Sequence, residues 1–370
     1  CEVSPSTKNI ERQGAWLLNL DMVEQQTGRV IEYKYVGEDD LNGSIIQFDT
    51  ENVLYSKLRP NLNKVVLPPK DGFSTSELLP LRPDASVLNK DYLAAFLRSD
   101  SFVTWAVSKT AGAKMPRLGT KDLMNAEIPV PSIEQQKKIA EKFKKLEQLI
   151  SLRKQQLAKL DELVKARFVE MFGDPVSNPY NWEKVSLSEL ADIRIGPFGS
   201  LLHKEDYIEG GHPLVNPSHI IDGKIVIDEK LTVSHQKYVE LEAYHLKAGD
   251  VVMGRRGEMG RCAVVSQEDL LCGTGSLLIR PKGKVTADYI QKIISFPSFK
   301  KMIEDMAVGQ TMPNLNVPIV SAFQIIKPPV QVQENYYTFV TQVDKSKLTI
   351  RQSLDKLEVL KKALMQQYFG

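Results

Sequence analysis

The chain has 370 residues, of which 42% are hydrophobic and 25% are charged, and its formal net charge is +2. This balance is typical of a globular protein of two or three domains, and it excludes a largely disordered chain, a collagen-like chain and a disulfide-rich scaffold. No apolar run approaches the roughly 18–20 residues that a membrane-spanning helix needs. The first thirty residues contain acidic side chains and no apolar block, so we expect no signal peptide and a cytoplasmic protein.

The chain repeats one plan twice. When the sequence is shifted by 197 positions, residues 112–173 align with residues 309–370 without a gap, and 16 of the 62 positions are identical. The similarity extends upstream with small gaps. In the second copy, residues 182–203 form an opening segment for which we expect no counterpart in the first copy. Together with the start at Cys1, this predicts that some native sequence is missing at the amino terminus.

In chain order, residues 1–133 are predicted to form a first globular domain, because the strand-like run NVLYSKL (52–58) precedes a helical pattern at 91–107. Residues 134–172 are predicted to form one long helix of about 58 Å, which Gly173 ends. Residues 173–330 repeat the globular pattern with GDVVMG (249–254) and a helical stretch at 287–303. Residues 331–370 repeat the long helix.

Apolar residues along both long helices recur at alternating steps of four and three, the spacing of a coiled-coil seam. A core stripe against a globular domain would have the same spacing, but two such helices in one chain most simply pack against each other. We therefore predict an α+β fold in which two β-rich globular domains are separated by two long antiparallel coiled-coil helices, with pseudo-twofold internal repetition. The predicted packing residues are Ile139, Phe143, Leu146, Ile150, Leu157, Leu160, Val340, Val343, Ile350, Leu354 and Leu357.

Catalytic and metal-binding motifs are missing from the sequence. The five histidines lie between positions 203 and 245 without the spacing of metal ligands, and we interpret them as surface or core residues. There is no phosphate-binding glycine loop. Asn178-Pro179-Tyr180 lacks the second proline of an adenine methyltransferase motif, and Asp21 with Glu32-Tyr33-Lys34 resembles a nuclease pattern only superficially. We therefore predict no catalytic residue, no metal site and no cofactor on this chain.

The sequence resembles the specificity subunits of type I restriction–modification systems. The resemblance rests on residues 127–175, EIPVPSIEQQKKIAEKFKKLEQLISLRKQQLAKLDELVKARFVEMFGDP, and on NVLYSKLRPNLNKVVLP (52–68), STSELLPLRP (74–83) and GAKMPRL (112–118). The second half adds WEKVSLSELADIRIG (182–196) and a final helix ending in MQQYFG. The resemblance covers nearly the whole chain.

The resemblance implies a non-catalytic subunit whose two globular domains are target-recognition domains, each reading one half of a split, asymmetric double-stranded DNA site. The helices would be spacers that set the gap and dock two methyltransferase subunits, and restriction subunits would join the complex. S-adenosylmethionine, ATP and Mg²⁺ would belong to those partners. The alternatives are a specificity module of a type IIB-like or other methylation-linked system, and a nuclease in its own right.

Local basic segments are the candidate DNA contacts, because both globular parts carry slightly more acidic than basic residues. Arginine reads guanine in a bidentate manner, whereas lysine more often contacts phosphate. Across the repeat, Lys57 aligns with Arg255. The alternative is a generic solvated face for the cations and turn hydroxyls for the serine and threonine. The candidates are Lys57, Arg59, Lys64, Ser76, Lys114, Arg117, Arg255, Arg256, Arg261 and Thr274.

Overall fold

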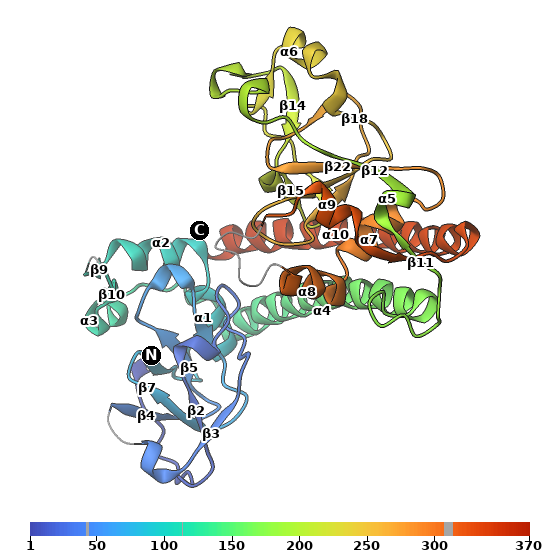
Figure 1. The fold of residues 1–370 in the computed structure, drawn as a ribbon. Coiled ribbons are helices and arrows are strands. Elements are labelled where there is room, and N and C mark those ends of the chain that lie inside the picture. Colours follow the sequence, from blue (N-terminus) through green and yellow to red (C-terminus); the bar gives the residue numbers. More distant parts are fainter. Residues whose placement is uncertain (42–43, 113, 307–313) are drawn as a thin grey trace. The chain divides into compact units, whose positions relative to one another are not determined.

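The structure, a computed structural model, describes residues 1–370 except 42–43, 113 and 307–313 (Figure 1). Its described part divides into two compact units. Unit 1 contains residues 1–157 and 348–370, and unit 2 contains residues 158–347. Each unit combines a globular part with one stretch of each long helix. The aligned residues 309–313 of the sequence repeat lie outside the described residues.

Among its described residues, the globular part of unit 1 contains short strands and three short α-helices, and β9 and β10 lie between the second and third helices. The strands are β1 (Glu2–Val3), β2 (Ala15–Leu18), β3 (Lys34–Val36), β4 (Ile45–Phe48), β5 (Val53–Ser56), β6 (Val65–Val66), β7 (Gly72–Thr75), β8 (Leu78–Arg82), β9 (Thr110–Ala111) and β10 (Arg117–Leu118). The helices are α1 (Lys90–Leu97), α2 (Asp100–Ser108) and α3 (Thr120–Met124).

The globular part of unit 2 repeats this plan, with additional strands and with two additional α-helices among its first strands in the residues that the structure describes. The strands are β11 (Lys184–Ser186), β12 (Ala191–Ile195), β13 (Tyr207–Ile208), β14 (His212–Val215), β15 (Ile220–Ile221), β16 (Lys224–Ile225), β17 (Thr232–Val233), β18 (His245–Leu246), β19 (Val251–Gly254), β20 (Cys262–Val264), β21 (Leu270–Cys272), β22 (Ser276–Pro281) and β23 (Gln324–Ile326). The helices are α5 (Leu187–Leu190), α6 (His235–Glu240), α7 (Ala287–Ile294), α8 (Pro297–Met306) and α9 (Val317–Ser321).

The two globular parts share their sheet topology. One sheet has the order β1-β8-β5-β6 in unit 1 and β12-β22-β19-β20 in unit 2. A second sheet contains one parallel pair in each unit, β2 with β7 and β14 with β21, and each pair continues to an antiparallel neighbour, β4 or β18. The internal repeat predicted from the sequence is therefore a repeat of the fold.

Consecutive apolar residues in β5 and β19 are buried because both faces of these strands are covered. Val53 and Tyr55 pack in the core beneath α1 and α2, whereas Leu54 faces a separate cluster with Trp16 and Phe48. Val251 and Val252 divide between two clusters of unit 2 in the same way. Side chains alternate across a strand, so a continuous apolar run is what a strand between two cores requires.

Matched buried polar contacts hold the same joint in both units. Gln136 is fully buried; its side chain accepts a bond from the Asn89 N–H at 2.8 Å and donates to the Val87 and Pro131 carbonyls at 2.9 and 2.8 Å. Gln333 occupies the matching position, accepting from the Thr286 N–H at 3.1 Å and donating to the Pro328 carbonyl at 2.9 Å. Each glutamine ties the entry of a long helix to the N-cap residue of a helix in its globular part, α1 in unit 1 and α7 in unit 2.

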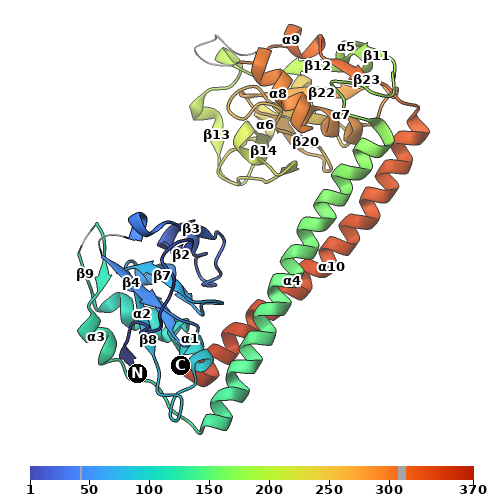
Figure 2. The ribbon, with the colours of Figure 1, turned by 90° about the horizontal axis from the view of Figure 1, so that it is seen from below.

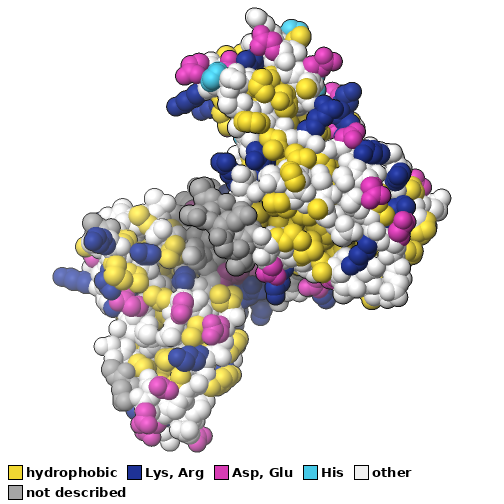
Figure 3. Space-filling model, viewed as in Figure 1, with side chains coloured by type: hydrophobic (Ala, Val, Ile, Leu, Met, Phe, Trp, Pro, Cys, Tyr) yellow, Lys and Arg dark blue, Asp and Glu magenta, His cyan; other side chains and the backbone are white. Residues whose placement is uncertain are grey.

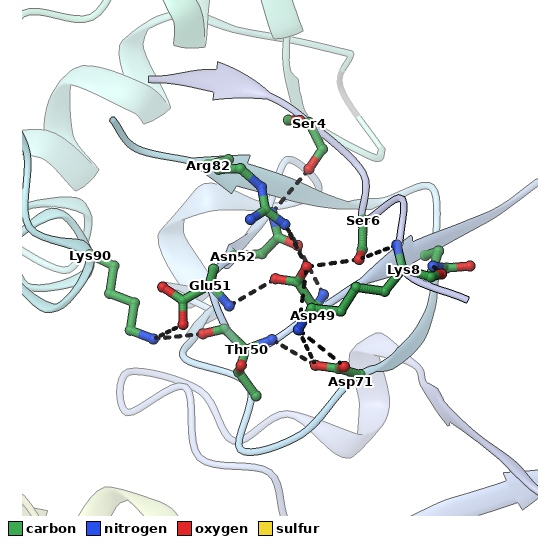
Figure 4. A network of polar contacts seen from close by, with 11 residues as sticks. Ser4, Ser6, Lys8, Asp49, Thr50, Glu51, Asn52, Asp71, Arg82 and Lys90 are labelled. Atoms are coloured by element: carbon green, nitrogen blue, oxygen red, sulfur yellow. Dashed lines mark hydrogen bonds and ion pairs between the residues drawn. The ribbon is translucent and has the colours of Figure 1, made fainter. Parts of the chain in front are cut away.

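A buried aspartate–arginine pair is also repeated. In unit 1 the Asp49 carboxylate lies 2.7 Å from the Arg82 guanidinium and accepts a bond from the Ser6 hydroxyl at 2.7 Å (Figure 4). In unit 2 Arg280 makes two bonds of 2.7–2.8 Å to Asp250. Asp49 and Asp250 are each 2% exposed, so these pairs are part of the structural core.

The long helices are α4 (Ile133–Phe172) and α10 (Val330–Phe369), each continuous over 40 residues (Figure 2). They run antiparallel. In unit 1 Glu147 of α4 pairs with Lys361 of α10 at 2.9 Å. In unit 2 Asp161 of α4 pairs with Lys347 of α10 at 2.6 Å. The α+β fold class, with its internal repeat and antiparallel long helices, is confirmed.

The ends of both helices belong to the globular cores rather than only to each other. In unit 1 Phe143 and Phe369 stack at 5.8 Å inside the core that contains α1 and α2. In unit 2 Phe168, Phe172 and Tyr336 lie in the core with α7. Burying such a ring contributes about 2 kcal/mol. All eleven predicted packing residues lie at buried or half-buried positions; the buried ones are Ile139, Phe143, Leu146 and Val343.

The expectation that residues 182–203 lack any counterpart is wrong in part. β12 pairs Asp192 with Arg280, and β1 pairs Glu2 with Arg82 in the same place of the matching sheet. β1 is therefore the counterpart of β12. β11 and α5, which precede β12, have no counterpart in the part of unit 1 that the structure describes.

Candidate nucleic-acid interface

Five of the six candidate residues in unit 1 gather where three loops meet. The Lys57 N–H, just after β5, donates to the Glu77 carbonyl at 3.1 Å, and the Lys57 carbonyl accepts from the Leu118 N–H at 2.9 Å. The Arg59 N–H donates to the Pro116 carbonyl at 2.8 Å. These bonds place the end of β5 beside the β7–β8 turn and the β9–β10 hairpin. The group formed in this way contains Lys57, Arg59, Ser76, Lys114 and Arg117.

The cations of this group differ in their exposure and in the hydrogen bonds and ion pairs that they already form. Arg59 and Lys114 are exposed, and the Arg59 guanidinium lies 3.5 Å from the Lys114 carbonyl oxygen. Arg117 is exposed but forms an ion pair with Glu77 at 3.0 Å. Lys57 is half-buried. Two cations of this group, those of Arg59 and Lys114, therefore have no ion-pair partner among the described residues, whereas Arg117 is held by Glu77.

Lys64 stands apart from the other candidates. Its ammonium donates to the Leu20 carbonyl oxygen at 2.5 Å and is half-buried. Burial lowers the pKa of Lys64, and the nearby Asp21 only partly opposes that shift. The amine supports the β2 region of the fold, and a role in contacting DNA stays a prediction.

The four candidates of unit 2 meet on two adjoining loops. The β19–β20 loop carries Arg255, Arg256 and Arg261, and its ends are joined by a bond of 2.9 Å from the Gly254 N–H to the Arg261 carbonyl. The Arg255 N–H donates to the Gly275 carbonyl at 2.9 Å, which brings the β21–β22 turn with exposed Thr274 alongside.

The three arginines of this loop differ in whether their side chains already form hydrogen bonds within unit 2. Arg255 is half-buried, its Nε donates to the Leu315 carbonyl at 2.9 Å, and burial lowers the pKa of Arg255, with Arg256 adding to the effect. Arg261 bonds to Glu258 at 2.9 Å and to the Pro217 carbonyl at 3.2 Å. Arg256 is exposed, and no side-chain partner contacts it among the described residues.

The alignment of Lys57 with Arg255 holds in three dimensions. The Lys57 N–H bonds to Glu77 and its carbonyl to Leu118, and Arg255 makes the same two bonds to Gly275 and Leu315. The surrounding side chains differ, because Glu77 is replaced by a glycine.

Over the visible face, basic side chains are interspersed with acidic ones (Figure 3). Attraction for a polyanion is therefore local in each unit.

Unit 1 also has an aromatic surface, which the search for basic segments in the sequence did not predict. In unit 1 the Lys70 ammonium lies 4.3–5.2 Å from the ring centres of Trp16, Tyr33 and Tyr35, and the two tyrosines are 46% and 58% exposed. Tyr33 directly precedes β3 and Tyr35 lies within it, and this spacing of two residues is the signal that could have revealed the surface. Exposed rings beside a cation suit contact with a nucleotide.

Three of the five histidines, His212, His235 and His245, gather around Tyr238, whereas His219 bonds to the Leu214 carbonyl oxygen. Tyr238 lies between His212 and His245, with ring centres 3.9 and 3.8 Å away, and a His212 nitrogen lies 3.1 Å from His235. Among the described residues, no three histidine, cysteine or acidic side chains are placed to hold a metal ion.

The Asn178-Pro179-Tyr180 stretch is a turn after α4, in which the Asn178 side chain bonds to the Trp182 backbone.

Comparisons with known proteins agree with this architecture. A family model for the type I restriction modification DNA specificity domain matches residues 29–162 and 179–360. The MjaVIII type I restriction enzyme specificity subunit of Methanocaldococcus jannaschii is 23% identical over 319 residues, which cover 80% of this chain and 73% of that protein. The EcoDI specificity subunit of Escherichia coli is 27% identical over 124 residues, which cover 34% of this chain and 27% of that protein.

Two solved structures share the fold. A chain from a study of complex assembly and conformational transition in a type I R-M system superposes with a TM-score of 0.64 at 18% identity, covering 96% of this chain and 91% of that one. The S subunit of the type I restriction–modification system of M. genitalium superposes with a TM-score of 0.59 at 15% identity, covering 97% and 89%.

The two repeated α+β globular parts, each joined to the long helices, correspond to the two regions that the DNA specificity domain model matches. The chain belongs to the type I restriction modification DNA specificity family, because the family model matches most of its length. The resemblance inferred from the sequence is thereby confirmed. No described helix is long and apolar enough to cross a membrane.

Proposed function

We propose that this chain is the specificity subunit of a type I restriction–modification complex, in which each unit reads one half of a split, asymmetric DNA site. The observation that carries the proposal is the matched backbone position of Lys57 and Arg255, each beside exposed cations of its own unit. Two homologous scaffolds that offer different side chains at one matched position suit two different half-sites.

The long helices would set the gap between the half-sites and dock two methyltransferase subunits, and restriction subunits would join that core. Both helices carry apolar side chains that are not used inside the chain. Leu149, Leu152 and Leu163 of α4 are 44%, 54% and 47% exposed. Exposed apolar residues on a charged helix are suited to a protein interface. S-adenosylmethionine, ATP and Mg²⁺ would be bound by the partner subunits.

A methylation map tests the recognition role. The chain is co-expressed with its cognate methyltransferase subunit in a host without DNA methylation, and methyladenine is located by single-molecule sequencing. We expect a split motif with one methylated adenine in each half. A continuous motif, or no methylation from a complex that co-purifies intact, would contradict the proposal.

Substitution of Arg256 tests the proposed contact in unit 2. R256A in the complex with the methyltransferase should weaken DNA binding and flatten the plot of log affinity against log salt by about one unit, because one phosphate contact is lost. K184A is the matched control: it also removes one exposed positive charge, on β11, and should leave the slope unchanged. An R256A slope equal to that of the unmodified complex would exclude this contact.

Exposed leucines on α4 test the docking role. L149D with L152D should leave the thermal unfolding of the chain nearly unchanged, because both side chains are exposed. The methyltransferase should no longer co-elute with this variant. L146D is the contrasting variant, because Leu146 is 7% exposed and its loss should destabilise unit 1 by about 3 kcal/mol. Normal co-elution of the methyltransferase with the L149D/L152D variant would exclude this docking surface.

A further inference from the structure

The aromatic surface of unit 1 lies on the sheet in which β3 is the edge strand beside β2 (Figure 1). Tyr35 pairs directly with Trp16 across these two strands, so both side chains lie on one face of the sheet. The Tyr33 ring stacks on the Trp16 ring, with ring centres 5.2 Å apart and ring planes inclined by 29°. Trp16 is 3% exposed and packs into the core, whereas Tyr33 and Tyr35 are 46% and 58% exposed. The buried tryptophan therefore anchors a surface whose exposed part is two tyrosine rings.

Lys70 reaches this surface from the position directly ahead of residues 71 and 72, where β7 begins. Its ammonium lies 4.3 Å from the ring centre of Tyr35 and 5.0 Å from that of Tyr33, and it donates a hydrogen bond to the Tyr35 hydroxyl. The neighbouring carboxylate of Asp71 pairs with Lys8 instead, at 3.3 Å. In the part of the chain that the structure describes, no ion pair joins Lys70 to a carboxylate. A phosphate that approached this surface would therefore meet a cation without a competing acidic side chain.

The inner ring faces of the aromatic surface are already covered. Trp16 and Tyr33 stack on each other, and the Lys70 ammonium lies over the rings, so no base could slide between them. The hydroxyl of Tyr35 is already used by Lys70. What the surface still offers is apolar ring area. In the major groove of DNA, the apolar group that a base edge presents is the C5-methyl group of thymine.

Unit 2 has no aromatic ring at the matching positions. The parallel pairing of Leu214 with Leu271 corresponds to that of Leu17 with Phe73, which fixes the equivalence of the two sheets. In this register the positions of Trp16, Tyr33, Tyr35 and Lys70 are occupied, in that order, by Pro213, Lys230, Thr232 and Glu268. The aromatic surface therefore distinguishes the two units, as the reading of two different half-sites requires.

We propose that Tyr33 and Tyr35 contact the methyl group of a thymine in the half-site of unit 1, with a backbone phosphate at Lys70. This inference rests on the proposed function and names a base that the aromatic surface reads. The tyrosine rings supply discrimination between thymine and a base without the methyl group. Lys70 supplies attraction that does not depend on sequence.

Uracil in place of thymine tests the proposal, because it removes the methyl group and changes nothing else on the base. Each half of the methylated motif contains a thymine opposite its methylated adenine, and every thymine of both strands is replaced in turn. With the methyltransferase complex, we expect one replacement to weaken binding about fourfold, as the loss of one buried methyl group should. Y35A should weaken binding of the thymine duplex by a similar factor and abolish the difference at that thymine.

Three further variants separate the ring from the other groups. Y35F should retain the difference between thymine and uracil, because it keeps the ring and removes only the hydroxyl. F198A removes a ring of unit 2 that is 59% exposed, and it should leave the difference unchanged. K70Q should keep the difference but flatten the plot of log affinity against log salt by about one unit, because one phosphate contact is lost.

The outcomes that overturn the proposal are distinct from a failure of the proposed function. If the uracil differences are the same in the Y35A complex as in the unmodified complex, the rings do not contact a thymine methyl group. If Y35A releases the methyltransferase instead, the surface binds protein and the proposal is wrong. A split methylation motif would leave the proposed function intact in both cases.

Discussion

Unit 1 and unit 2 share a scaffold but differ at their surfaces. The shared features are buried and polar: the glutamine at the entry of each long helix, the aspartate–arginine pair and the tyrosine that bonds to the segment before the helix. The differences lie in the loops around Lys57 and Arg255 and in the segment that covers β23. A repeated protein can thus fix its fold through a few buried bonds while its exposed loops diverge.

The aspartate–arginine pairs should give the largest effect on stability. R82A leaves the buried Asp49 carboxylate with only the exposed Lys8 ammonium, 3.8 Å away, and R280A leaves the buried Asp250 carboxylate without its arginine. We expect each variant to lose about 3 kcal/mol of unfolding free energy, because an unpaired buried charge is costly. Hydrogen exchange resolved by residue should locate the loss in unit 1 for R82A and in unit 2 for R280A.

The double variants D49N/R82A and D250N/R280A are the controls for this comparison. Each removes the charge together with its partner and should recover part of the lost stability. A loss in R82A that spread equally over both units would contradict a local effect of the Asp49–Arg82 pair. No loss would show that Ser6, the Glu51 N–H and Lys8 are sufficient to hold the Asp49 carboxylate.

The buried glutamines should give a smaller effect that differs between the units. Q136L removes three hydrogen bonds, to Asn89, Val87 and Pro131, whereas Q333L removes two, to Thr286 and Pro328. Each change leaves buried backbone groups unpaired, so we expect losses of about 2 kcal/mol, with the larger loss for Q136L. Chemical denaturation of both variants measures the difference, and an equal or reversed order would contradict this account.

The sequence was sufficient to predict the features that recur with a period. The shift of 197 residues and the four-three spacing of apolar residues predicted the repeat and both long helices, whose observed ends lie within one residue of those expected. The sequence could not show which of the candidate cations already bond to other groups of the protein. Arg117 pairs with Glu77, forty positions away, and Lys64 bonds to the backbone of Leu20. Such contacts depend on loop geometry that leaves no local pattern.

Neither the aromatic surface around Lys70 nor the equivalence of β1 to β12 could be predicted from the sequence, and the reasons are related. The aromatic surface forms only because β2 pairs with both β3 and β7. This pairing brings Lys70, which directly precedes β7, next to Trp16, Tyr33 and Tyr35. β1 has two residues, too few for any periodic signal. Its equivalence to β12 becomes visible only through the pairing of Glu2 with Arg82.

Acid should weaken unit 1 through Asp49, which gives the smallest expected effect. Burial alone would raise the pKa of Asp49, but hydrogen bonds from Ser6, Arg82 and the Glu51 N–H outweigh it and leave the pKa below its ordinary value. A carboxyl group with a lowered pKa in the folded state contributes stability that is fully present above the unfolded pKa, about 3.9, and is lost as the pH falls through the folded value. We expect unit 1 to lose stability through this group as the pH falls below about 4 and towards the folded pKa. The matched comparison is D49N, in which that part of the acid sensitivity should vanish. Urea unfolding at a series of pH values measures both chains, and an identical pH dependence in D49N would show that other carboxyl groups account for the loss.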